Sequence, residues 1–182
     1  LAGDKLFIYA FETAAKAFAL TDRADLVGEA ISILANKAGI YGMIGGQSVD
    51  VEYTDRPVTK SQLEFIYELK TAALLEAAMM IGAVLAGADD NQVKAAEQIA
   101  HHVGMAFQIR DDILDVISTT EELGKPVKSD EKNNKTTYVT IYGLDGASKL
   151  VEEYSHTAMT LLDQVCPNAS FLKRLFEYLI VR

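Results

Sequence analysis

Hydrophobic residues recur every three to four positions along most of the chain, and strict alternation with polar residues is almost absent. This spacing is typical of helices that bury one face, so it predicts an all-α helical bundle. The predicted helices cover about residues 4–20, 24–38, 59–85, 90–117 and 146–165, with a short one after Pro167. A further helix is predicted within residues 39–53, where several glycines indicate close packing of backbones.

Several helix starts carry their own signals. Thr59 and Gln62 have the spacing of a capping box, in which two side chains satisfy backbone amides at a helix start. Asp89 or Asp90 can begin the helix that continues to about residue 117. The chain has three prolines, each at a predicted helix boundary: Pro57, Pro126 and Pro167.

Composition narrows the class of protein. The 182 residues, 49% of them hydrophobic, suit one folded domain with a substantial core. A formal net charge of -9 argues against binding to nucleic acid or to anionic lipid. The longest apolar run, residues 71–88, is interrupted by Glu76, so no membrane insertion is expected. The single cysteine, Cys166, excludes an intramolecular disulfide and favours a cytoplasmic location.

The segment FQIRDDILDV, residues 107–116, places acids in an otherwise apolar helix. At about 100° per residue, one sector of this helix carries four polar side chains: Gln108, Asp111, Asp112 and Asp115. Apolar residues flank the sector on both sides, which favours a position facing a cavity, and Gly104 in the same sector is expected to leave space there. Magnesium uses such carboxylates together with water and phosphate oxygens. A solvated acidic face, or ion pairs with lysines, would explain the same spacing.

Cationic residues near this helix extend the pattern. Lys70 and Thr71 lie in the middle of a predicted helix, where either a surface position or a cavity-facing position is compatible with the sequence. The polar loop at residues 119–138 contains four lysines: Lys125, Lys128, Lys132 and Lys135. Acids and lysines together indicate a site for a metal ion and a polyphosphate.

Four segments, in this order and spacing, resemble the motifs of the trans-isoprenyl diphosphate synthases, also called polyprenyl synthetases. They are GGQSVDVE (45–52), LKTAAL (69–74), FQIRDDILDV (107–116) and GKPVKSDEKNNKTTY (124–138). The resemblance covers essentially the whole chain, and its details are most similar to the bacterial members that make farnesyl diphosphate. It implies a helical bundle of the isoprenoid synthase type, with residues 1–182 forming one partial domain.

The resemblance also implies an activity. Members of the family ionise an allylic diphosphate (dimethylallyl or geranyl) with the help of Mg2+, join the carbocation to isopentenyl diphosphate and release a proton. The implied product is short, with farnesyl diphosphate as the product of the most similar members, and the implied assembly is a homodimer.

Residue roles follow from the same resemblance. The implied magnesium ligands are Asp111, which binds directly, and Asp112 and Asp115, which bind directly or through water. The implied catalytic residues are Lys70, Thr71, Gln108, Lys125 and Lys135. The implied substrate-binding residues are Gln47, Asp50, Lys70, Phe107, Gln108, Lys125 and Lys135.

One motif of the family is not found in this sequence. The first aspartate-rich motif, with its pair of arginines, is expected upstream of Leu1, so the chain is expected to be a C-terminal portion that is nearly inactive alone. Two other classes stay open: a non-catalytic helical subunit, and another magnesium-dependent terpenoid enzyme. The intact acids and lysines argue against the first class, and the Lys-Thr and NNKTTY segments argue against the second.

Overall fold

A computed structural model gives the structure of the chain and describes residues 1–118 and 135–181. The helices are α1 (Ala2–Ala15), α2 (Ala24–Ala38), α3 (Met43–Glu52), α4 (Lys60–Tyr67), α5 (Ala73–Leu85), α6 (Asp90–Ile117), α9 (Tyr138–Val165) and α10 (Ser170–Val181). A 3-10 helix (Lys16–Ala19) follows α1, and a π-helical turn (Glu68–Ala72), called the π turn below, joins α4 to α5. All regular elements of the described residues are helical, which confirms the predicted all-α fold.

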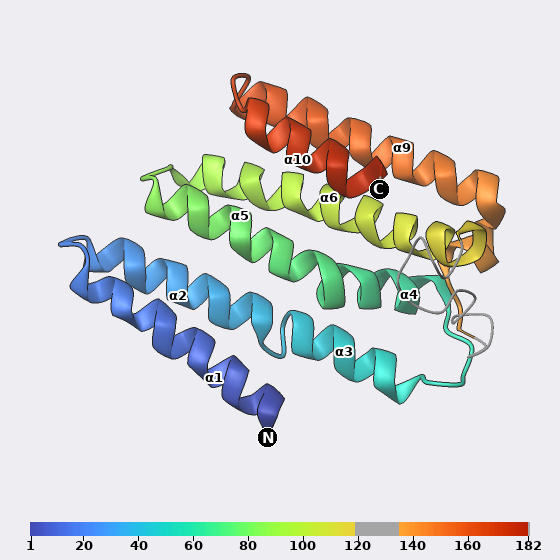
Figure 1. The fold of residues 1–182 in the computed structure, drawn as a ribbon, viewed down its shortest axis with the longest axis horizontal. Helices are drawn as coiled ribbons and strands as arrows, with labels where there is room; N and C mark the ends of the chain where they lie inside the picture. Colours follow the sequence, from blue (N-terminus) through green and yellow to red (C-terminus); the bar gives the residue numbers. More distant parts are fainter. Residues whose placement is uncertain (119–134, 182) are drawn as a thin grey trace.

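The long helices lie side by side, as Figure 1 shows, with α5, α6 and α9 as neighbours and α1 at one edge. α6 packs against both α5 and α9, and α10 returns to contact α6 and α9. The helix that carries the acids is therefore central. No helix within the described residues is both long enough and apolar enough to cross a bilayer.

The predicted helix starts are confirmed at two positions. Thr59 accepts a hydrogen bond from the amide of Gln62, whose side chain accepts from the Thr59 amide. Asp89 and Gln92 form the same reciprocal pair at the start of α6.

The start of α9 differs from the prediction. The helix begins at Tyr138 rather than near residue 146, because Thr137 and Thr140 form a third capping box. Gly143 interrupts the helix with φ 70° and ψ 171°, a left-handed backbone conformation that glycine adopts without strain. The predicted helix therefore corresponds to the part of α9 that follows this break.

Two glycines allow helices to approach the π turn. A Cβ atom on Gly46 would lie 2.4 Å from the backbone nitrogen of Lys70, which confirms the close packing predicted for this glycine-rich segment. A Cβ atom on Gly104 would lie 2.6 Å from the Cβ of Ala72. The expectation that Gly104 leaves open space beside the carboxylates is wrong, because Ala72 packs into that position.

A cluster of four charged residues links α2, α5 and α6. Lys37 Nζ lies 2.5 Å from carboxylate oxygens of both Glu76 and Glu97, and His101 Nδ1 lies 3.1 Å from the other Glu76 oxygen. Glu76 is only 7% exposed, so the residue that interrupts the apolar run is a buried charge with two partners. Its hydrogen bond raises the pKa of His101 above the ordinary value, although burial opposes the shift.

We expect Gly104→Ala to lower the free energy of unfolding by about 1–3 kcal/mol, because the added methyl group overlaps Ala72. Urea unfolding would measure the change. Gly28→Ala is the matched control: Gly28 lies inside α2 with no atom within 4 Å of the added Cβ, so stability should rise by about 0.5–1 kcal/mol. Unchanged stability in Gly104→Ala would contradict the close approach.

We expect His101→Gln to reduce stability more at pH 6 than at pH 9. Protonated His101 favours the folded state, so its contribution is complete below about pH 6.5, its ordinary pKa, and is lost as the pH rises through the raised pKa. Thermal unfolding of parent and variant across this range would measure the difference. His156→Gln, at an exposed position on α9, serves as the control. A stability difference that grows with pH would contradict the assignment.

Candidate active site

The π turn supplies two consecutive predicted site residues that contact different helices. Lys70 Nζ lies 2.5 Å from Oδ2 of Asp50 on α3, and Thr71 Oγ1 donates to Oε1 of Gln108 on α6 at 2.8 Å. π turns occur often at functional sites because the extra residue redirects the side chains. The π turn thus connects the predicted residues of α3 with those of α6, near the end of the layer where α3 and α4 meet (Figure 1).

Two lysines share the carboxylate of Asp50. Lys135 Nζ lies 3.6 Å from Oδ1 of Asp50, and Lys70 Nζ lies close to the other oxygen. The side chains are 34% exposed for Lys70 and 39% for Lys135, so both can still contact a solute. Two ammonium groups against one carboxylate leave a net positive charge, which suits a phosphate group.

A cavity of about 360 Å³ adjoins this group of charges. Its charged lining residues are Asp50, Asp55, Arg56 and Lys135, and apolar side chains such as Leu63 and Ile66 lie beside them. Arg56 was not predicted as a site residue; its position next to the glycine-rich segment, on the chain that joins α3 to α4, was the available signal. The cavity therefore offers two cationic and two acidic groups beside an apolar wall.

The three acids of α6 have different surroundings. Asp111 is half-buried, whereas Asp112 and Asp115 are only 4% and 3% exposed. The Tyr67 hydroxyl lies 2.9 Å and 2.7 Å from the two oxygens of Asp112, and the backbone amide of Tyr138 donates to Oδ2 at 3.1 Å. The carboxylate of Asp112 thus accepts hydrogen bonds from two other helices, α4 and α9. That Asp112 is a magnesium ligand stays a prediction.

The carboxylates suit a magnesium ion that is shared with a substrate. In the part of the chain that the structure describes, no three His, Cys, Asp or Glu side chains form a group that could hold a metal ion by themselves. Magnesium commonly takes one or two protein carboxylates and completes its octahedron with water and phosphate oxygens. Asp111 and Asp115, one helical turn apart, provide such a donor set.

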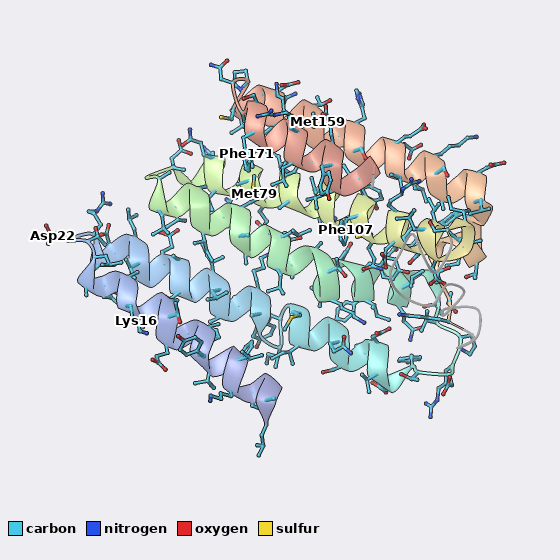
Figure 2. The ribbon with its side chains drawn as sticks, viewed as in Figure 1. Lys16, Asp22, Met79, Phe107, Met159 and Phe171 are labelled. Carbon is cyan, nitrogen blue, oxygen red and sulfur yellow. The ribbon has the colours of Figure 1, made fainter. Side chains whose placement is uncertain are left out.

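The remaining predicted residues are placed as follows. Gln47 is exposed on α3, about one turn before Asp50. Phe107, labelled in Figure 2, is half-buried on α6 and directly precedes Gln108 in the sequence. Lys125 lies outside the described residues. Tyr67, which contacts Asp112, was missed; the available signal was a tyrosine at a core position three residues before Lys70.

Comparisons of this chain with the sequences of known proteins give a consistent result. The polyprenyl synthetase family model matches residues 1–169. Over 182 residues the chain is 36% identical to a farnesyl diphosphate synthase of Geobacillus stearothermophilus, covering all of this chain and 61% of that protein. It is 38% identical to a dimethylallyltranstransferase of Fischerella ambigua, covering all of this chain and 53% of that protein. The chain thus spans only part of the length of these relatives.

Solved structures resemble the fold over nearly the whole chain. A geranyltransferase of Helicobacter pylori, complexed with magnesium and isoprenyl diphosphate, superposes with a TM-score of 0.82 at 32% identity and covers 98% of this chain and 58% of that one. An FPP/GFPP synthase of Zymomonas mobilis gives a TM-score of 0.83 at 26% identity, with 98% and 59% covered. On the family match and these likenesses, the chain belongs to the polyprenyl synthetase family.

Proposed function

We propose that the protein is a short-chain prenyltransferase that joins dimethylallyl or geranyl diphosphate to isopentenyl diphosphate, with farnesyl diphosphate as its product. The observation that carries the proposal is the pair of lysines on Asp50, connected through the π turn to the acid-bearing helix α6. The names of the relatives, which include farnesyl diphosphate synthases, support this choice of substrates.

The charges of the site fit the departure of diphosphate. Cleavage of the allylic carbon–oxygen bond leaves negative charge on the diphosphate, and cations fixed beforehand stabilise it most effectively. Lys70 and Lys135 would hold that group from the α3 side. Asp111 and Asp115 would hold the magnesium; the resemblance implies Asp112 as a third ligand, a role that is tested below. Bound magnesium supplies further positive charge to the leaving group.

The reaction then forms one carbon–carbon bond and releases one proton. The double bond of isopentenyl diphosphate attacks the allylic carbocation, and a proton leaves the resulting adduct. Gln108 and Thr71, which are hydrogen-bonded to each other, would line the reacting centre, and Phe107 would contribute an apolar wall. Such walls protect a carbocation from water.

Other parts of the proposal concern the whole protein. Lys125 would bind the allylic diphosphate and Gln47 would contribute to the substrate-binding site, within one domain to which residues 1–182 contribute. A homodimer in the cytoplasm is proposed as the working form. Exposed apolar side chains on α1, such as Leu6 at 70% and Ile8 at 66%, support an association surface.

The proposed function is tested with the natural protein and two substrates, isopentenyl diphosphate and geranyl diphosphate. We expect magnesium-dependent formation of farnesyl diphosphate, and EDTA should abolish it because the carboxylates would lose their ion. Asp111→Asn should lower turnover about 100-fold or more, since a metal ligand contributes several kcal/mol.

The same variant has a binding readout. Calorimetry with inorganic pyrophosphate and magnesium should show weaker binding to Asp111→Asn than to the parent. Asp163→Asn, at an exposed position on α9, is the control that removes one carboxylate elsewhere. Equal pyrophosphate binding and normal turnover in Asp111→Asn would contradict its role.

We expect Lys70→Ala to lower turnover about tenfold or more while the free energy of unfolding changes by about 1 kcal/mol or less. Lys70 is one-third exposed, so its ion pair with Asp50 contributes little to stability. Steady-state kinetics and urea unfolding would separate the two effects. Lys16→Ala is the control, because Lys16 forms an exposed ion pair with Glu12 on α1, far from the π turn (Figure 2). Normal kinetics with lowered stability would make Lys70 a structural residue.

A further inference from the structure

The carboxylate of Asp112 lies where three helices meet. It accepts hydrogen bonds from the Tyr67 hydroxyl at the end of α4 and from the Tyr138 amide at the start of α9, while Asp112 itself belongs to α6. The exposed fractions are 4% for Asp112, 4% for Tyr67 and 2% for Tyr138. The two tyrosine rings also contact each other, with centroids 5.3 Å apart.

These hydrogen bonds hold the carboxylate in the core. Its two partners, Tyr67 and Tyr138, belong to one buried cluster that also contains Ile109 and Ile113 of the same helix as Asp112. A buried carboxylate is stable only while its hydrogen bonds are kept, and bonds to a charged acceptor are stronger than neutral ones. Turning Asp112 toward a metal ion would break them.

We infer that Asp112 is a positioning residue, not a magnesium ligand, and that Tyr67 acts through it. This inference rests on the proposed function. Asp112 connects the acid-bearing helix to the two segments that carry the phosphate-binding lysines.

The connection is short on both sides. Lys70 follows Tyr67 by three residues along α4 and the π turn, and Lys135 precedes Tyr138 by three residues. Both lysines then contact Asp50. Loss of the Tyr67 hydroxyl therefore displaces cations relative to Asp111, although no group that touches substrate has been removed.

The first test is kinetic, in the natural protein. Tyr67→Phe should lower kcat about tenfold, because small displacements of binding groups have large effects on rate. The magnesium concentration for half-maximal turnover should stay within about twofold, since no ligand is lost; Asp111→Asn should raise it about tenfold or more. Adding Tyr67→Phe to Asp112→Asn should have almost no further effect if the two act as one unit.

The second test needs no activity and uses thermal unfolding in EDTA. Tyr67→Phe and Asp112→Asn should each lower Tm by about 5 °C, because the hydrogen bonds exist without metal. Tyr154→Phe is the matched control: Tyr154 packs against the same buried cluster and should leave both kcat and Tm near the parent values.

Three outcomes would overturn the inference. A tenfold rise in the magnesium requirement of Asp112→Asn, without loss of Tm in EDTA, would make Asp112 a ligand. Lowered Tm with unchanged kcat in Tyr67→Phe would make the contact purely structural. A kcat loss in Tyr154→Phe equal to that of Tyr67→Phe would show that the effect is not specific to the contact between Tyr67 and Asp112. Absence of prenyl transfer in the parent protein would instead refute the proposed function and leave the EDTA test valid.

Discussion

The arrangement of this end of the molecule depends on accommodating carboxylates inside an otherwise apolar helix. Asp112 and Asp115 are almost fully buried on α6, and unpaired charge at such depth is unfavourable. For Asp112 the neighbouring helices supply hydrogen-bond donors: α4 contributes a hydroxyl and α9 a backbone amide. The packing of α4 and α9 on α6 is therefore specified by hydrogen bonds as well as by apolar contact.

The π turn transmits this arrangement to the lysines, and two glycines fix its place. Gly46 of α3 lies against the backbone of Lys70, and Gly104 of α6 lies against Ala72. The turn is thus in close contact on both sides, where a methyl group on either glycine would not fit without movement. Side chains that leave the turn have little freedom to shift relative to α3 and α6, which is what a preorganised site requires.

Local signals in the sequence predict much of this structure. The capping pairs at Thr59 and Asp89 mark helix starts because they involve residues only three positions apart. The neighbours of Gly104 and the two hydrogen-bond partners of Asp112 come from distant parts of the chain, so periodicity carries no information about them. The π turn is equally hidden, since one extra residue in a turn barely changes an apolar pattern.

Two clusters of ion pairs, one around Lys37 and one around Asp50, differ in charge balance. The difference distinguishes a cluster that stabilises the fold from one that suits a ligand. Lys37 lies between Glu76 and Glu97, and His101 adds a donor to Glu76, so this cluster satisfies its own charges between α2, α5 and α6. At Asp50 the stoichiometry is reversed, because two lysines contact one carboxylate. A half-exposed excess of positive charge is unfavourable for folding alone, and it becomes useful when an anion is bound. The cluster at Asp50 is therefore the one that the proposed binding of a diphosphate would explain.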